Sequence, residues 1–248
     1  MKNLRAAVKL LLFTALTLGI YSFWWLLSFV VPNKIYWRQT AFGWWAKSFV
    51  IVSGMKIETI GKPPRPPFFL VTNHLSYVDI AALRCVLTGV FVAKAEVNTW
   101  PVAGRICRDM GTIFINRSNR RDIPRAGVEI IQRLEAGEGV VVFPEGTSTK
   151  GDKVHPFNSS FLEFAAKAEV PVSYAAITYR TPDGEMAASS AVCWWEDIGF
   201  FAHMYRLFKV PTFTAILNFG DEPIVGHDRK ALAADLRRHV ADRFIPVL

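Results

Sequence analysis

The stretch FFLVTNHLSYVD, residues 68–79, sets an apolar run directly against a polar segment and the start of a helical pattern. The first five residues are mostly aromatic or β-branched, a composition that predicts a buried strand. Residues 78–87 then repeat apolar side chains at helical spacing. Ligands of α/β proteins usually bind where a strand ends and the next helix begins. The stretch therefore predicts an α/β fold with a polar site at residues 73–79.

The same alternation continues along the rest of the chain. Further strands are expected at residues 90–95, 112–116, 139–145, 170–179, 191–195 and 212–220, and further helices at 122–136, 159–168 and 228–244. Several of these strand segments are apolar on both faces, which is typical of a sheet buried between helices. We expect a mostly buried mixed sheet flanked by helices.

The first 60 residues have a different character. Residues 10–32 carry no charge and are about as long as a helix that crosses the hydrocarbon core of a membrane. A second apolar run, residues 37–55, is interrupted only by Arg38 and Lys47. We expect a membrane-embedded helix pair, and the alternative is that the second run is the first amphipathic helix of the globular fold. The proline-rich segment 61–69 then divides the chain into membrane-anchoring helices at 1–60 and a globular domain at 61–248.

The net charge of the chain limits the classes of partner that it is expected to bind. Lys and Arg number 29 against 21 Asp and Glu, a net charge of +8, which fits anionic lipid headgroups or phosphorylated substrates. The basic residues form no long block or recognisable nucleic-acid module, so no nucleic-acid partner is expected. Lys2, Arg5 and Lys9 precede the uncharged run and predict a cytoplasmic N-terminus. The run continues through aromatic residues instead of a cleavage site, which indicates a retained anchor.

His74 and Asp79 are the first residues with catalytic potential. They are five positions apart, so on one regular helix their side chains would diverge. We therefore expect His74 in the loop before the helix and Asp79 in the first helical turn. There the carboxylate can accept a hydrogen bond from one imidazole nitrogen and leave the other free as a base. The alternative is a polar helix cap beside a histidine with satisfied hydrogen bonds.

The segment GTIFINR, residues 111–117, places a glycine before an expected strand and Arg117 after it. The guanidinium group of arginine has a fixed fork of donors that suits a phosphate. An arginine after a strand is also commonly a solvated surface charge. The segment is therefore a weak indication of an anion site when it is taken alone.

The segment VVVFPEGTST, residues 140–149, ends a second apolar strand with polar residues. Glu145 needs a partner there because a lone buried carboxylate is costly. Gly146 allows a backbone or a ligand to approach closely, and Thr147 and Ser148 supply hydroxyl groups. The alternative is a capped turn that leads to the next segment.

Together, in this order and spacing, the three segments resemble the glycerolipid acyltransferase family, specifically the bacterial lysophosphatidic acid acyltransferases, over roughly residues 60–180. The resemblance implies that His74 is the general base and that Asp79 orients it. It also implies that Arg117 binds the phosphate or headgroup of the acceptor. The implied substrate-binding residues are Asn73, Gly111, Arg117, Phe143, Pro144, Glu145, Gly146, Thr147 and Ser148.

The resemblance also implies a reaction and a location. An acyl chain would pass from acyl-CoA or acyl carrier protein to the free hydroxyl of 1-acyl-glycerol-3-phosphate, with no metal and no other cofactor. The domain at 61–248 would be the catalytic domain, on the cytoplasmic side of the bacterial inner membrane. Two departures leave the acceptor open. Ser148 stands where the family often has Arg, and the chain has Ser173 and Tyr174 where the fourth family segment often has a second Pro. Another lysolipid, such as lyso-ornithine lipid, is the alternative acceptor.

Two other classes of protein remain to be weighed. A metal-dependent membrane hydrolase would use His74, Asp79 and Glu145, but the sequence has no dense cluster of ligands at metal spacing, and its three cysteines are far apart. A non-catalytic membrane-binding protein would explain the anchor and the charge. It gives no reason for a His and an Asp at the end of a strand. We rank the acyltransferase first, the hydrolase second and the binding protein third.

Overall fold

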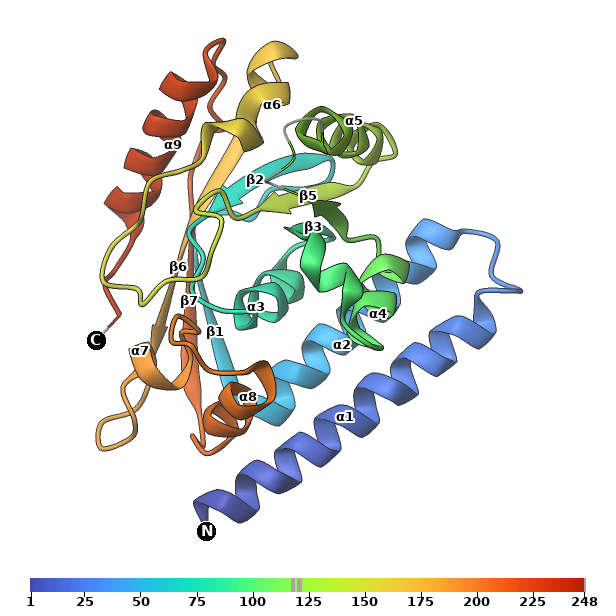
Figure 1. Cartoon of the computed structure of the whole chain (residues 1–248), viewed down its shortest axis with the longest axis vertical. Helices are drawn as coiled ribbons and strands as arrows, with labels where there is room; N and C mark the ends of the chain where they lie inside the picture. Colours follow the sequence, from blue (N-terminus) through green and yellow to red (C-terminus); the bar gives the residue numbers. More distant parts are fainter. Residues whose placement is uncertain (117–118, 120–121, 248) are drawn as a thin grey trace.

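The computed structural model describes residues 1–116, 119 and 122–247. Its centre is a seven-stranded sheet with the order β1-β7-β6-β2-β5-β3-β4 (Figure 1). All neighbouring strands are parallel except β6 and β7, so the predicted mixed sheet is confirmed. The strands are β1 (Met55–Ile60), β2 (Phe68–Thr72), β3 (Gly89–Lys94), β4 (Ile113–Ile115), β5 (Gly139–Val142), β6 (Val172–Arg180) and β7 (Phe213–Phe219).

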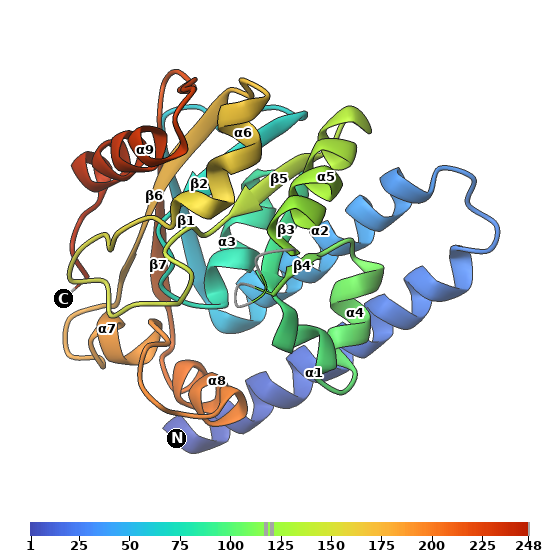
Figure 2. The same ribbon diagram turned by 45° about the horizontal axis from the view of Figure 1, so that its top comes forward.

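Helices cover both faces of the sheet, as Figure 2 shows. They are α1 (Lys2–Leu27), α2 (Lys34–Ser53), α3 (Val78–Val86), α4 (Ala103–Asp109), α5 (Asp122–Glu135), α6 (Glu163–Lys167), α7 (Ala188–Ala191), α8 (Phe200–Phe208) and α9 (Arg229–Arg243), with short 3-10 turns at Ala95–Thr99 and Ser159–Leu162. Strand residues alternate between two cores. Leu70 packs with α2, α3 and α8 on one face, while Phe69 and Val71 pack with α5, α6 and α9 on the other.

Two expectations about the strands differ from the structure. The strand expected at residues 191–195 is wrong: α7 ends there and an irregular segment follows. The two indole groups explain the difference, because Trp194 donates through Nε1 to the Ile198 carbonyl at 2.8 Å and Trp195 to the Ser189 carbonyl at 2.9 Å. Such local bonds satisfy the polar ends of the aromatic rings without a strand. Strand β1, which the sequence reading missed, lies within residues 1–60 and belongs to the sheet.

Within the described residues, α1 is the one helix long and apolar enough to cross a membrane. Helix α2 instead buries Phe42, Ala46 and Phe49 against the domain, so a membrane-embedded pair is not shown. Gly54 ends α2 with φ +79°, and a β-carbon there would lie 2.3 Å from the Pro211 carbonyl oxygen. Only glycine fits this turn.

Helix α1 lies along the rest of the structure over most of its length. Near its start, Arg5 donates through Nη1 to the Lys209 carbonyl at 3.0 Å, and Lys9 donates through Nζ to the Ser53 carbonyl at 2.7 Å. Near its end, the Tyr21 hydroxyl donates to Asp109 Oδ2 at 2.5 Å. The opposite face of the helix exposes large apolar side chains, namely Leu4, Val8, Leu11, Leu12, Leu18, Phe23, Trp25 and Leu26.

Candidate active site

Two loops meet where β2 and β5 end. The two strands are parallel neighbours in which Val71 lies opposite Val142, so the segments that follow them leave the same edge of the sheet. The backbone of His74 joins the loops, because its carbonyl accepts from the Thr149 N–H at 3.0 Å. The fold therefore brings the residues after β2 together with the residues after β5, which agrees with the shared site that the family resemblance implies.

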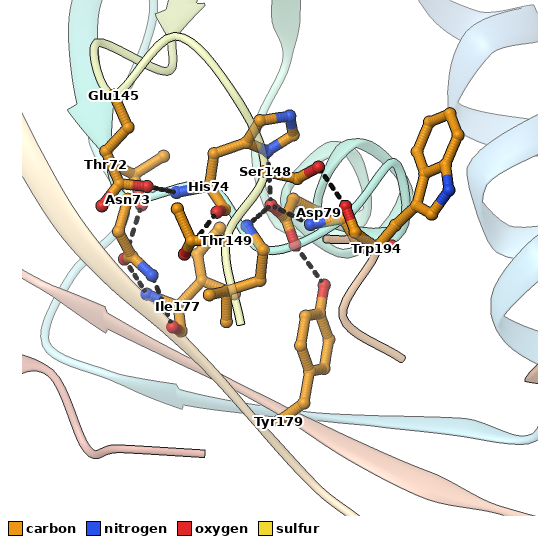
Figure 3. A network of polar contacts seen from close by, with 12 residues as sticks. Thr72, Asn73, His74, Asp79, Glu145, Ser148, Thr149, Ile177, Tyr179 and Trp194 are labelled. Atoms are coloured by element: carbon orange, nitrogen blue, oxygen red, sulfur yellow. Dashed lines mark hydrogen bonds and ion pairs between the residues drawn. The ribbon is translucent and has the colours of Figure 1, made fainter. Parts of the chain in front are cut away.

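The His74 imidazole is held by the Asp79 carboxylate, with His74 Nδ1 2.8 Å from Asp79 Oδ2 (Figure 3). His74 lies before α3 and Asp79 in its first turn, which is the predicted geometry. Asp79 is fully buried, and the same oxygen accepts from the backbone N–H groups of Leu75 at 2.8 Å and Ser76 at 3.1 Å. A carboxylate only accepts, so Nδ1 carries the proton. In the neutral imidazole this tautomer has its free lone pair on Nε2, and the His74 side chain is 20% exposed.

Tyr179, at the end of β6, is a member of the site that the sequence reading missed. Its hydroxyl donates to Asp79 Oδ1 at 2.7 Å, on the opposite side of the carboxylate from His74 (Figure 3). Burial and the neighbouring charge of Asp79 raise the pKa of Tyr179 well above its usual value, so the phenol keeps its proton. A tyrosine near the end of a buried strand was the available signal, because a buried hydroxyl needs a partner.

The ring of Phe143 stacks on the imidazole of His74. The ring centroids are 4.1 Å apart and the ring planes differ by 20°. Phe143 follows β5 directly and is buried in the core on the α2 and α3 side of the sheet. Together, the Asp79 carboxylate fixes one edge of the imidazole and Phe143 fixes one face.

The Glu145 carboxylate ties two backbone segments to the site. Its Oε2 accepts from the His74 N–H at 2.8 Å and its Oε1 accepts from the His155 N–H at 2.8 Å. Burial raises the pKa of Glu145 to about 7, although these two N–H groups act to lower it. The backbone N–H groups of His74 and His155 are therefore the partners that a buried carboxylate at position 145 needs. In this structure Glu145 holds the backbone of His74 in place.

Asn73 and Gly111 make contacts with the protein itself. The buried Asn73 amide pairs with the backbone of β6: it donates to the Ile177 carbonyl at 2.9 Å and accepts from the Ile177 N–H at 2.8 Å. Gly111 precedes β4, so it lies toward the opposite edge of the sheet from His74. A β-carbon there would lie 1.6 Å from Arg38 Nη1, which explains a glycine at this position. Their proposed role in substrate binding stays a prediction.

The remaining residues of the third segment belong to the loop that follows β5 beside His74. Pro144 is buried, Gly146 has φ +82°, and Thr147 is exposed to solvent. The Ser148 hydroxyl donates to the Trp194 carbonyl (Figure 3). Arg117 lies outside the described residues. The strand before it, β4, is parallel to β3 and ends at the same edge of the sheet as His74.

The site holds His74 in a fixed orientation that suits a general base. Among the described residues, it has no serine or cysteine that His74 could activate as a nucleophile. In the described part of the chain, no serine or cysteine side chain is hydrogen-bonded to His74, and Ser76 is fully buried. Among the same residues, no three His, Cys, Asp or Glu side chains are grouped so that they could hold a metal ion. The geometry therefore fits deprotonation of a substrate hydroxyl by His74 Nε2.

Comparisons with known proteins agree with this geometry. Residues 55–178 match the family model described as Acyltransferase. The chain is 30% identical over 204 residues to the lyso-ornithine lipid O-acyltransferase of Pseudomonas aeruginosa, which covers 82% of this chain and 78% of that protein. It is 31% identical over 163 residues to the 1-acyl-sn-glycerol-3-phosphate acyltransferase of Neisseria gonorrhoeae, covering 64% of this chain and 63% of the relative.

A solved structure has the same fold. The crystal structure of the 1-acyl-sn-glycerophosphate (LPA) acyltransferase PlsC from Thermotoga maritima superimposes with a TM-score of 0.69 at 22% identity, covering 98% of this chain and 97% of that one. The family match begins at β1, ends within β6 at residue 178, and includes His74 and Asp79. The chain belongs to the Acyltransferase family, and it is an acyltransferase.

Proposed function

We propose that this acyltransferase moves an acyl chain from acyl-CoA or acyl carrier protein to the free hydroxyl of a lysolipid. The observation that carries the proposal is the imidazole of His74, oriented by Asp79 and open at Nε2. The first candidate acceptor is 1-acyl-glycerol-3-phosphate, with phosphatidic acid as the product. The names of the relatives in Pseudomonas and Neisseria support a lysolipid acceptor.

The proposed reaction is a direct transfer. His74 Nε2 takes the proton from the acceptor hydroxyl as the oxygen attacks the thioester carbonyl. The new C–O bond forms, the C–S bond breaks, and the imidazolium returns the proton to the leaving thiolate. Asp79 stabilises the positive charge on the imidazole during the reaction, because its carboxylate lies 2.8 Å from Nδ1. Arg117 is proposed to bind the acceptor phosphate or headgroup.

The proposal has two versions, which differ in the acceptor lysolipid. Lyso-ornithine lipid is the second candidate, because the relatives in Pseudomonas aeruginosa and Brucella abortus are named for it, at 30% and 34% identity. The purified full chain would be incubated with acyl-CoA or acylated acyl carrier protein as the donor and with lysophosphatidic acid or lyso-ornithine lipid as the acceptor. The products would be identified by mass spectrometry. An acylated product from one lysolipid names the acceptor. No acylated product from any lysolipid, with either donor, would refute the proposal.

A matched pair of variants tests the base. His74→Ala should lower turnover by about 10² to 10⁴, the usual contribution of a general base. His155→Ala is the control, because His155 contacts Glu145 through its backbone and its side chain is partly exposed. Near wild-type turnover by His74→Ala would rule out the assignment.

We further propose that α1 lies in one leaflet of the bacterial inner membrane with the domain on the cytoplasmic side. The polar contacts of Arg5, Lys9 and Tyr21 hold both halves of α1 on the domain, which supports a helix in the plane of the interface. A cysteine introduced at the exposed Val30, in the hairpin after α1, tests this. An impermeant maleimide added outside intact spheroplasts should leave it unlabelled, whereas a helix that crosses the membrane would present it to the reagent.

A further inference from the structure

A cavity lies between α2 and the segment that joins α3 to β3. Its volume is about 290 Å³, and its lining comes from Gln39, Thr40, Gly43, Trp44 and Lys47 of α2 and from residues 84–88. Arg84 belongs to the last turn of α3, whereas Asp79 belongs to the first. The cavity is therefore at the opposite end of α3 from the His74 site.

The lining includes a buried cation whose hydrogen bonds reach only neutral groups. Arg84 is 6% exposed, and it donates through Nη1 to the Leu87 carbonyl at 2.7 Å and through Nη2 to the Gln39 carbonyl. Its Nε–H has no partner. No carboxylate forms an ion pair with it anywhere in residues 1–116, 119 and 122–247. Burial lowers the pKa of Arg84 to about 10, which reflects the cost of this charge.

A neighbouring arginine shows how the protein usually balances such a charge. Arg38 lies on α2 and is buried like Arg84. It donates through Nη2 to both oxygens of Glu138, at 2.8 and 2.6 Å. A buried ion pair of this geometry compensates much of the cost of removing both charges from water. Among the described residues Arg84 has no carboxylate partner of this kind, and its guanidinium instead lies 5.2 Å from the centre of the Phe42 ring. An anion from outside would supply the negative charge that this arginine lacks.

Two further residues shape the cavity for an anion. Lys47 stands exposed at the rim and adds a second positive charge. Gly43 lies beside the guanidinium, and a β-carbon there would be in van der Waals contact with it, 3.5 Å from Arg84 Nη2. A guanidinium and an ammonium group that face one small cavity are suited to a phosphate.

We propose that this cavity binds the phosphate group of a phosphate ester, at a site separate from the catalytic centre. Its rim adjoins the apolar surface of α1: Trp44 is 40% exposed, and its ring lies 6.2 Å from that of Phe23, which is 48% exposed. A membrane phospholipid could therefore place its headgroup in the cavity and its chains against α1. Coenzyme A and free phosphate offer the same chemistry from solution.

The test is calorimetric titration of the full chain in a neutral detergent without an acyl donor, so the result is independent of the proposed reaction. The probes are short-chain phosphatidylglycerol, diacylglycerol as its phosphate-free match, coenzyme A and inorganic phosphate. Each is titrated into the wild type, Arg84→Met and Lys47→Glu. Lys56→Glu, on strand β1 at the far edge of the sheet, is the control for net charge.

We expect a phosphate-bearing probe to bind the wild type, and both cavity variants to weaken it by about tenfold or more while Lys56→Glu leaves it unchanged. Binding of phosphatidylglycerol alone identifies a lipid as the source, and binding of coenzyme A or phosphate identifies a soluble one. Lys47→Glu keeps the test decisive if Arg84→Met does not fold, because Lys47 is exposed. Three results would overturn the proposal: no phosphate-bearing probe binds, diacylglycerol binds equally well, or Lys47→Glu binds no more weakly than Lys56→Glu.

Discussion

Replacing Glu145 by glutamine should separate the stability of this enzyme from its activity. The pKa of Glu145 is about 7 in the folded chain, against a usual value of 4.5, because burial disfavours the charged carboxylate. The folded state therefore holds a proton that the unfolded chain has released between these two values. Stability must fall as the pH rises through this window, and the full penalty is present above pH 7.

The difference between the two pKa values sets the size of the effect. It corresponds to at most about 3 kcal/mol, which is about 6 to 12 °C in melting temperature for a chain of this size. Glutamine carries no charge, so Glu145→Gln should gain stability relative to the wild type as the pH rises from 4.5 to 8. It also places an NH₂ group against the His74 or His155 N–H, where a carboxylate oxygen had accepted, so the His74 loop should shift and turnover should fall.

Thermal unfolding of the wild type and the variant, measured in detergent across this pH range, checks the stability. Acyl transfer at pH 8 checks the activity. Glu135→Gln, which replaces an exposed carboxylate at the end of α5, is the control and should follow the wild type in both. The reasoning is refuted if the variant follows the pH curve of the wild type, or loses stability relative to it as the pH rises.

Three further changes test other parts of the structure. Tyr179→Phe removes the donor to Asp79 Oδ1 and should lower the free energy of unfolding by about 1.5 to 3 kcal/mol, measured by urea denaturation; no change would mean that the bond is absent. Asp79→Asn should lower turnover while the protein stays folded by circular dichroism, and full turnover would show that the charge on Asp79 is dispensable. Arg38→Met leaves the buried Glu138 without its main partner. It should lower the free energy of unfolding by about 3 to 5 kcal/mol in the same urea assay, and a loss below about 1 kcal/mol would contradict the importance of this pair.

The sequence predicts the parts of this fold that depend on local patterns. Strands β2, β5 and β6 were predicted because each is a continuous apolar run, and all three are buried. Strand β1 was missed because it lies at the edge of the sheet with four of its six residues exposed, and it follows α2 after a single glycine. The apolar content of residues 191–195 predicts a strand, but it does not show that an indole N–H needs a partner nearby.

The contacts of the site also divide into those that the sequence predicts and those that depend on the fold. The contact between His74 and Asp79 was predictable because the two residues belong to one short segment, and the start of a helix fixes their separation. Tyr179 is 100 positions from Asp79, and only the packing of β6 beside β2 brings them together. The double backbone contact of Glu145 was equally out of reach, because it depends on the path of a loop that contains His155.

The contacts between α1 and the rest of the chain limit the order in which the protein can fold during synthesis. Lys9 donates to the carbonyl of Ser53, which follows soon after it, and also to the carbonyls of Val210 and Pro211, about 200 residues later. The ribosome therefore completes α1 long before it completes the surface on which α1 rests. If α1 lies in the membrane as proposed, lipid covers its apolar side chains during synthesis. The finished domain then closes against a segment that is already in place. Removing α1 to obtain a water-soluble enzyme would uncover the aromatic surface around Phe49 and Phe208, so the shortened chain should aggregate.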